Sequence, residues 1–187
     1  MIPPVLKTDR LILRPHRVQD FDDVTAMWAD PEVVRHISGT PSSRSDSWGR
    51  LLRYIGHWQA LGFGYWVVES RGDGQFLGEV GFADYQRDIT PSLGGVPEAG
   101  WVLSSAAHGQ GYASEAVQRM HQWADEETDW RETVCIFDPK HTVSQRVATK
   151  VGYKVSGEAL FMEQPTLVMR RPGGIVDPVF TPGATVR

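Results

Sequence analysis

The stretch from Trp101 to Val117 constrains the fold more than any other part of the 187-residue chain. It opens with a short apolar run, Trp101 to Leu103, that is typical of a β-strand. Small residues then lead into Gly109-Gln110-Gly111. Beyond the glycines, apolar residues recur at the spacing that gives a helix one apolar face: Ala113, Ala116, Val117, Met120, Trp123 and Ala124. The sequence therefore predicts a strand, a glycine turn and an amphipathic helix in direct succession.

The glycine turn predicts a binding site for an anion. Two glycines at a strand-to-helix turn allow positive φ and let a ligand approach the backbone closely. The first turn of the following helix has free N–H groups and the positive end of the helix dipole. Together these features favour a phosphate or pyrophosphate.

Several interpretations of this turn compete. It can be a plain tight turn that binds nothing. A dinucleotide-binding turn needs a third Gly or Ala where this chain has Ser114, and an acid at the end of the next strand, whereas Glu132 precedes that strand. A nucleotide P-loop needs Gly-Lys-Ser/Thr, which is absent. The remaining interpretation is a loop for the pyrophosphate of coenzyme A.

This last interpretation is supported by a family resemblance. The segment from His108 to Ala113 (His-Gly-Gln-Gly-Tyr-Ala) resembles the acyl-CoA loop of the GNAT acetyltransferases, Gln/Arg-x-x-Gly-x-Gly/Ala. With Ser114-Glu115-Ala116 it looks most like the RimJ/RimL branch of ribosomal-protein N-terminal acetyltransferases. The opening segment, Thr8 to Pro15, resembles the first strand of that branch. His108 departs from the pattern, because it stands at the Arg/Gln position.

A second segment strengthens the resemblance. Residues 138–153 resemble the family's Asn-x-x-Ser segment that ends in Gly-Phe/Tyr, with His141 in the Asn position and Ser144 in the Ser position. Two spaced segments in the right order are more specific than either alone. The resemblance covers roughly residues 5–171 and implies one α/β (α+β) GNAT domain. We expect a mixed sheet of about seven strands, splayed at the acyl-CoA site, with about four helices packed on it. A tail rich in Pro and Gly follows at residues 172–187.

Patterning places these elements along the chain. Strands are predicted at residues 6–15, 63–69, 76–85, 98–103, 132–137, 153–161 and 166–170. Besides the central helix, a short helix is predicted at 20–28, stopped by Asp30-Pro31. A second is predicted after a polar loop at 38–47, with Trp48, Leu51, Leu52, Ile55 and Trp58 on one face and Gly62 as its stop. A third turns Val143, Val147, Ala148 and Val151 inward and ends at Gly152.

Composition narrows the function classes. The formal net charge of −4 gives no support for nucleic-acid binding. Cys135 is the only cysteine and lies in an apolar strand, which favours an inert buried thiol. His36, His57 and His121 lack metal-ligand spacing, so no metal is expected. No signal peptide or long apolar run is visible, which predicts a cytoplasmic protein without membrane contact. We expect a monomer or a homodimer.

The resemblance also assigns site residues. It implies that the backbone of Trp101, Val102 and Leu103 pairs with the pantetheine arm of acetyl-CoA. The pyrophosphate would lie on the loop formed by His108, Gly109, Gln110, Gly111, Tyr112, Ala113 and Ser114. It places Ser144 near the coenzyme sulfur, where a hydroxyl can protonate the departing thiolate; the alternative is a helix-cap serine. His141 would contact the coenzyme, and Glu115 suits a loop-bracing role.

Acetyl transfer to an amine also calls for a proton acceptor. Glu98, just before the central strand, is the predicted base, and Glu79 on the preceding hairpin is its competitor. The alternative for each is a strand-end acid that faces solvent. The acceptor itself, a protein N-terminal α-amine or a small amine, is expected to meet residues 38–58 and 86–97. The first range carries Trp48, Tyr54 and Trp58, and Tyr85 adjoins the second. A catalytically weak acyl-CoA-binding module remains the alternative function.

Overall fold

The computed structural model describes residues 3–174, and its centre is a nine-stranded sheet. In chain order the strands are β1 (Leu6–Lys7), β2 (Leu11–Pro15), β3 (Tyr65–Ser70), β4 (Phe76–Ala83), β5 (Ile89–Thr90), β6 (Glu98–Leu103), β7 (Glu132–Phe137), β8 (Lys154–Phe161) and β9 (Gln164–Pro172). The helices are α1 (Phe21–Ala29), α2 (Pro31–Val34), α3 (Arg44–Leu61), α4 (Tyr112–Glu127) and α5 (Thr142–Lys150). Two 3₁₀ turns, η1 (Val18–Asp20) and η2 (Ser105–Ala107), precede α1 and α4.

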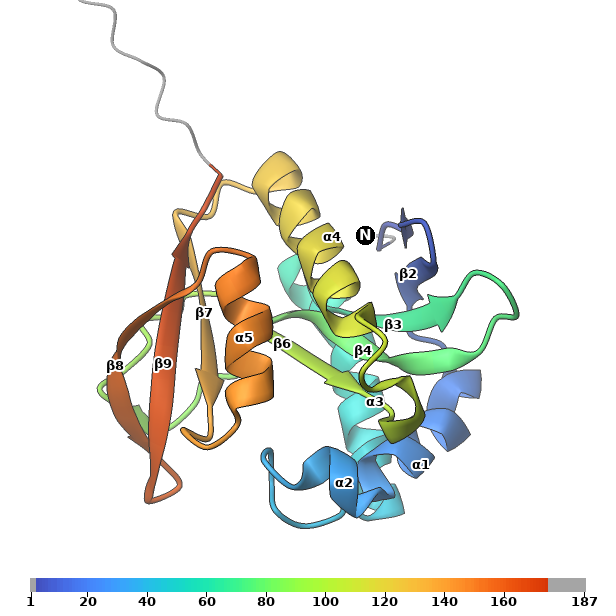
Figure 1. Cartoon of the computed structure of the whole chain (residues 1–187), viewed down its shortest axis with the longest axis horizontal. Helices are drawn as coiled ribbons and strands as arrows, with labels where there is room; N and C mark the ends of the chain where they lie inside the picture. The colour runs from blue at the N-terminus through green and yellow to red at the C-terminus, as the bar shows by residue number, and fades with distance from the viewer. Residues whose placement is uncertain (1–2, 175–187) are drawn as a thin grey trace, which may run out of the picture.

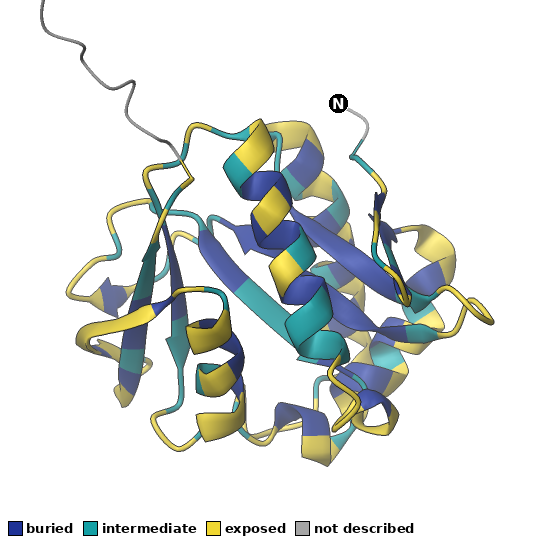
Figure 2. Cartoon of the chain, turned by 45° about the horizontal axis from the view of Figure 1, so that its top comes forward, coloured by how far each residue is buried: buried dark blue, intermediate teal, exposed yellow. Residues whose placement is uncertain are grey.

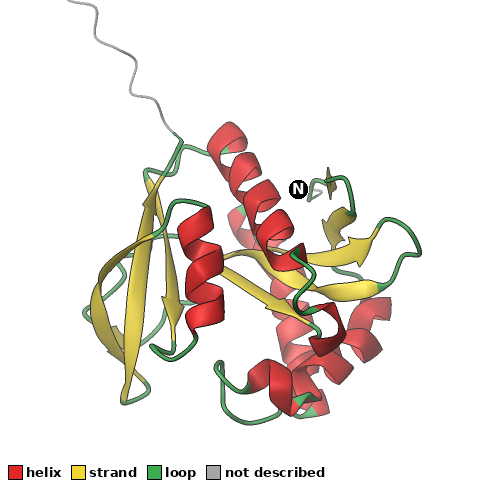
Figure 3. Cartoon of the chain, in the orientation of Figure 1, coloured by secondary structure: helices red, strands yellow, loops and turns green. Residues whose placement is uncertain are grey.

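The sheet is mixed and covered on both faces. Its strand order is β1-β2-β3-β4-β6-β7-β9-β8-β5. Helices α4 and α5 lie in front of the sheet in the view of Figure 1, and α3 lies behind it (Figures 1 and 3). Apart from β6 and β7, the paired strands of the described chain run antiparallel. The dinucleotide-binding alternative requires a parallel sheet and is therefore excluded.

The main hydrophobic core fills the space between α4 and the strands behind it. Aromatic rings dominate it: Trp66 packs edge-on against Trp58, with ring centroids 4.8 Å apart, and against Trp123, at 5.0 Å. Such edge-to-face packing adds to the free energy gained by burying the rings. Figure 2 shows the inward side of α4 and the middle strands as buried, while the outer side of the helix is exposed. This core fixes α4 on the sheet, and with it the turn at the start of the helix.

The sheet splays between its two halves, as predicted. β6 and β7 are paired at a single position, Glu98 with Val134, and beyond it the two strands diverge (Figure 1). One further bond, from the N–H of Val134 to the carbonyl of Pro97 at 3.0 Å, closes the narrow end. On its other side β6 is paired with β4 along its whole length. The edge of β6 that faces β7 is therefore free of strand partners from Gly100 to Leu103.

The structure corrects several predicted elements. The first predicted strand is two short antiparallel strands, β1 and β2, joined by a turn. The polar loop is shorter than predicted, because Ser43 and Asp46 form a reciprocal capping box that starts α3. The predicted apolar face of α3 is partly wrong: Trp48 and Leu52 are exposed. The buried positions of that helix are instead Ser47, Leu51, Tyr54 and Trp58.

Two further details differ. In α5, Val143 points outward and is 59% exposed, whereas Val147 and Ala148 are buried as predicted. The short elements α2 and β5 were not predicted. Together with the division of the first strand into β1 and β2, they raise the counts to nine strands and five helices within residues 3–174. Within the same residues, no helix combines the length and the apolar composition that a membrane crossing requires. The predicted domain, residues 5–171, lies within the described part, and most of the predicted tail (172–187) lies outside it.

Candidate active site

The glycine turn joins β6 to α4 with the backbone geometry of an anion site. Gly109 and Gly111 both have positive φ, 75° and 80°, and Gly111 is the residue that precedes α4. A Cβ built on Gly109 would meet nothing within 4 Å. Glycine is therefore favoured at this position by the positive φ and not by a close neighbouring atom. In the first turn of α4, the N–H groups of Tyr112, Ala113 and Ser114 have no acceptor within the helix. These groups are suited to a phosphate oxygen.

Side chains of the loop hold its shape. The Nε2 nitrogen of His108 lies 3.0 Å from the carbonyl oxygen of Leu103, so that His108 ties the loop to the end of β6. Gln110 donates from Nε2 to the carbonyl of Ala106 at 2.9 Å. The histidine that stands at the Arg/Gln position of the family pattern thus stabilises the loop. Because the acceptor is a carbonyl oxygen, this hydrogen bond favours the His108 tautomer that carries its proton on Nε2.

A brace from the N-terminus supports the same turn. Arg10 donates from Nε to Oε2 of Glu115 at 2.7 Å, and Thr8 donates its hydroxyl to Oε1 at 2.6 Å. Arg10 also donates to the carbonyl of Gln110 at 3.0 Å and lies over the ring of Tyr112. Burial raises the pKa of Glu115, but the hydrogen bonds from Thr8 and Arg10 outweigh it and lower the pKa overall. Glu115 therefore braces the loop, as the sequence predicted. Its partner Arg10 was not predicted as a site residue.

The free edge of β6 combines packed side chains with an accessible backbone. Leu103 is buried in the main core, and Val102 packs against the cluster formed by α1 and α2. The ring of Trp101 lies across the splay from that of Phe137, with centroids 5.5 Å apart. Because β4 uses the other edge of β6, the N–H and C=O groups toward β7 are the ones available to an extended ligand.

Helix α5 brings Ser144 and His141 together. Ser144 is buried, on the same side of α5 as Val147 and Ala148. Its Oγ lies 3.3 Å from Nε2 of His141, the residue that precedes the helix. No side-chain capping bond is present at this helix start. The alternative role of Ser144 as a helix cap is therefore not supported by its contacts.

A second histidine stands behind His141. The rings of His36 and His141 are stacked, with centroids 4.8 Å apart and planes 18° from parallel. Nδ1 of His36 lies 2.9 Å from Oδ2 of Asp138, at the end of β7. Burial, followed by the proximity of His36, lowers the pKa of His141, while Asp138 acts in the opposite direction. His36 belongs to the loop after α2, so this contact joins the two sides of the splay.

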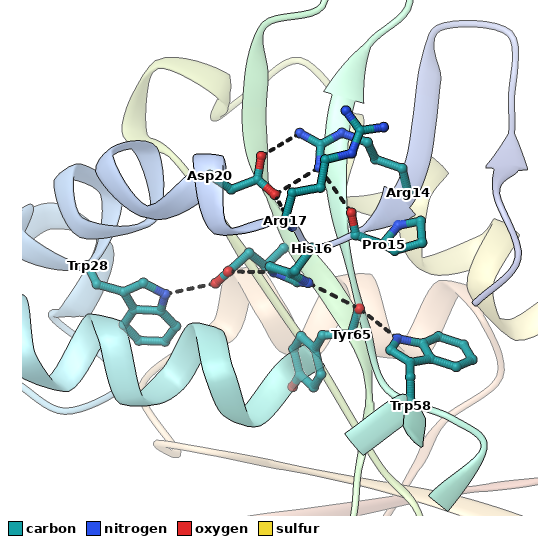
Figure 4. A network of polar contacts seen from close by, with 9 residues as sticks. Arg14, Pro15, His16, Arg17, Asp20, Trp28, Trp58 and Tyr65 are labelled. Carbon is teal, nitrogen blue, oxygen red and sulfur yellow. Dashed lines mark hydrogen bonds and ion pairs between the residues drawn. The ribbon is translucent and has the colours of Figure 1, made fainter. Parts of the chain in front are cut away.

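Glu79, the competitor for the base, is sealed inside the protein. Its side chain is fully buried, with Oε1 2.8 Å from Nε2 of His16 and Oε2 accepting from Nε1 of Trp28 at 2.8 Å. His16 and Trp28 thus contact different oxygens of this carboxylate. Figure 4 shows the ring of His16 between Trp28 and the carbonyl of Tyr65. Both oxygens of Glu79 are occupied, and the solvent-facing alternative is wrong for this residue.

Glu98 is also buried, but it borders a cleft. Arg87 donates to both of its carboxylate oxygens, at 2.7 and 2.8 Å. The guanidinium is held between the rings of Tyr85 and Phe161, 4.3 and 4.8 Å from their centroids. The cleft has a volume of about 250 Å³ and is lined by residues 83–89, 92–96 and 98. The solvent-facing alternative is wrong for Glu98 as well, and Arg87 is a site residue that sequence reasoning missed.

Three tyrosines, of which Tyr54 and Tyr65 are buried and Tyr85 is partly buried, lie near these two carboxylates. The rings of Tyr54 and Tyr65 are stacked, 4.3 Å apart and 3° from parallel, with Tyr85 beside them. The hydroxyl of Tyr65 fills the place that a Cβ would need at Gly100 of β6. Burial raises the pKa of all three tyrosines, so that their hydroxyls stay neutral. Of the aromatics expected to meet the acceptor, Tyr54 and Tyr85 gather here, whereas Trp48 is exposed and Trp58 belongs to the core.

Other predicted features are simpler. Cys135 is buried, and burial raises the pKa of its thiol well above the usual value, as expected of an inert cysteine. His57 bonds to backbone oxygens, and His121 is buried in a bond with the hydroxyl of Tyr153. Within residues 3–174, no group of three His, Cys, Asp or Glu side chains is arranged to hold a metal ion.

Known proteins share this sequence and architecture. The model of the acetyltransferase (GNAT) domain matches residues 10–154. The uncharacterized protein YkkB of Bacillus subtilis is 27% identical over 173 residues, covering 89% of this chain and 94% of its own. An acetyltransferase structure from Agrobacterium tumefaciens has a TM-score of 0.78 and 27% identity, over 91% of this chain and 95% of that chain.

A solved structure from the RimJ/RimL branch has the same fold. The structure of RimL, a ribosomal L7/L12 alpha-N-protein acetyltransferase in complex with coenzyme A, has a TM-score of 0.72. It covers 91% of this chain and 99% of that chain, but at 14% identity it supports the shared fold alone. The domain match over residues 10–154 is what decides the family, and it confirms the prediction of an acetyltransferase. The chain belongs to the GNAT family of acetyltransferases.

Proposed function

We propose that this enzyme transfers the acetyl group of acetyl-CoA to a primary amine by direct attack within a ternary complex. The observation that carries the proposal is the positive-φ glycine turn at the start of α4 beside the free edge of β6. Such a turn accepts the pyrophosphate, and the strand edge accepts the amides of the pantetheine arm. The residues present fit this coenzyme, which supplies the reactive thioester.

The protein's own part is positioning and proton movement. The loop from His108 to Ser114 binds the phosphates, and the backbone of Trp101, Val102 and Leu103 orients the arm along β6. Ser144 protonates the thiolate as it leaves. No serine, cysteine or other nucleophile on the enzyme is required, because the amine attacks the thioester itself.

Two acceptor classes fit this proposal, a protein N-terminal α-amine and a small amine. RimL, one of the structural neighbours, is described as acting on a ribosomal-protein N-terminus, which makes peptides with free α-amines the first class to test. The test measures acetyl-CoA consumption with a panel of N-terminal peptides and small amines. Turnover with any member supports transfer. Tight binding of acetyl-CoA without turnover on any member would favour the alternative, a catalytically weak acyl-CoA-binding module.

Replacement of Ser144 tests the proton donor. Ser144→Ala is expected to lower the turnover rate about tenfold or more, because general acid catalysis typically contributes 10²–10⁴-fold. The Kd for acetyl-CoA should change little, since the hydroxyl acts on the departing sulfur. Calorimetry and steady-state rates measure the two effects separately. Unchanged turnover with a less stable protein would show that Ser144 is structural.

Glu98 remains the proposed proton acceptor for the amine, although Arg87 now occupies both of its oxygens. An α-amine with a pKa near 8 is mostly protonated at neutral pH, but it loses its proton far more easily than a lysine amine, so a weak base suffices. Glu98→Gln is expected to depress turnover most at low pH and to leave coenzyme binding intact. Glu127→Gln, at the exposed end of α4, is the matched control. A pH–rate profile of the Glu98 variant that overlays that of the parent would show that the amine arrives already neutral.

A further inference from the structure

Residues close to His141 in sequence and one distant residue, His36, meet at its ring. The loop after α2 contributes His36, the end of β7 contributes Asp138, and α5 contributes Ser144. His108 of the glycine turn is close enough to act electrostatically on the same ring. His141 is thus held between the side chain assigned to the coenzyme sulfur and a stacked, carboxylate-bound histidine.

The hydrogen-bond geometry gives His141 a defined direction. Its Nε2 faces the Ser144 hydroxyl at 3.3 Å, and this is the only hydrogen bond of its side chain to the described residues. A neutral imidazole carries one proton on one of its two nitrogens. With the proton on Nε2, His141 donates to Oγ, and the hydroxyl proton of Ser144 is then free to point elsewhere. A serine hydroxyl directed at a departing sulfur needs this arrangement.

We propose that His141 is the proton relay that supplies Ser144 during acetyl transfer, and that His36 and Asp138 hold its ring in place. The inference rests on the proposed function, because it concerns the same thiolate. The asparagine that the family pattern has at this position donates a hydrogen bond but cannot pass a proton on. Histidine in place of asparagine at position 141 therefore gives the site a side chain that can pass a proton to Ser144.

The protons balance in four transfers. As the bond from the carbonyl carbon to sulfur breaks, the Ser144 O–H gives its proton to the sulfur. The Nε2–H of His141 gives its proton to Oγ and restores the hydroxyl, while Nδ1 takes one proton from water. The amine nitrogen, which has formed the new bond to the acetyl carbon, releases one proton through the base to water. His141 ends as the other neutral tautomer and exchanges back through solvent.

The surrounding charges suit a neutral relay. The charged and titratable groups facing the ring are His36 on one side, His108 from the glycine turn, and Asp138 with Lys140 before α5. Burial and His36 hold the pKa of His141 below its ordinary value, so the ring is uncharged at neutral pH. His36 touches neither sulfur nor Ser144 and is a positioning residue: it fixes the plane of the His141 ring by stacking.

The test measures the pKa of the coenzyme A thiol in its complex, from the ultraviolet absorbance of the thiolate against pH. It needs no acceptor, so it separates this inference from the proposed function. Four proteins are compared: the parent, Ser144→Ala, His141→Leu, which removes the hydrogen bond to Oγ, and the double variant. His57→Asn is the control, because within residues 3–174 the hydrogen bonds of His57 go to the backbone oxygens of Arg53 and Asp84, away from Ser144.

A relay predicts coupled effects. We expect either single variant to raise the pKa of the bound thiol by about one unit, which is a tenfold change in its ionisation, and the double variant to raise it no further. His36→Leu should give a smaller rise, and His57→Asn none. Equal thiol pKa values in the parent and His141→Leu, or additive rises in the double variant, would show that the two side chains do not act on the sulfur as one hydrogen-bonded chain. His141→Asn keeps a hydrogen-bond donor but cannot pass a proton on, so it should keep the pKa of the thiol and lower turnover about tenfold. Unchanged turnover in His141→Asn would overturn the relay. Failure of coenzyme A to bind the parent in calorimetry would instead overturn the proposed function.

Discussion

Gly111→Val is expected to weaken acetyl-CoA binding by about 100-fold or more, which is roughly 3 kcal/mol. Gly111 has φ 80°, a conformation that β-branched residues avoid at a cost of about 1–3 kcal/mol. The backbone of the variant must therefore rotate, and the N–H groups at the start of α4 turn away from a bound pyrophosphate. Calorimetric titration with acetyl-CoA measures the effect.

Gly74→Val provides a control matched in backbone conformation. Gly74 has φ 73° and lies in the turn between β3 and β4, where an added Cβ meets nothing within 4 Å. Both variants should lose stability to denaturant by similar amounts, but only Gly111→Val should lose the coenzyme. Equal affinities of the two variants for acetyl-CoA would place the binding site elsewhere.

Acidification from pH 7 to about pH 5 is expected to cost about 2 kcal/mol of unfolding free energy through His121 alone. His121 is 2% exposed, and burial lowers its pKa from 6.5 to about 4. The folded protein thus resists a proton that the unfolded chain accepts. Stability from this source is intact above the unfolded pKa and falls as the pH drops below it, until the folded pKa is reached. Below that point the loss is complete, at about 3 kcal/mol.

Urea unfolding at a series of pH values measures this loss. His121→Gln removes the titrating ring, and its stability should depend less on pH between these limits, even if its stability at pH 7 is lower because the bond to Tyr153 is gone. His57→Gln should keep the pH dependence of the parent. A slope that persists in His121→Gln would assign the acid sensitivity to other groups.

Local patterns explain what the sequence predicted well. The central strand and the one after it have the predicted bounds, Glu98–Leu103 and Glu132–Phe137. The alternation of apolar and polar residues and the positions of glycines depend on a few neighbouring residues. They therefore predict these strands independently of how the rest of the chain packs. The start of α3 was placed late although the sequence carried its signal, the Ser43 and Asp46 capping pair.

Contacts across the fold explain what was missed. Arg10 reaches Glu115 over a separation of 105 residues, and His36 reaches Asp138 over 102. No local pattern encodes such pairs, because sheet order decides which segments become neighbours. The same holds for Glu79: its position in a strand was predicted, but its enclosure by His16 and Trp28 depends on how β2 and α1 pack on that strand.

The single contact between β6 and β7 has a consequence for how the protein avoids self-association. A strand with an unpaired edge normally invites the strand of another molecule, which is a route to aggregation. Here the unpaired edge is in the interior of the sheet, because Glu98 and Val134 close one end and β7 flanks the rest. A strand of another molecule could pair with this edge only by entering between β6 and β7, where the rings of Trp101 and Phe137 lie 5.5 Å apart. The second half of the sheet thus shields the free edge of β6, proposed above to hold the coenzyme arm, from the strands of neighbouring molecules.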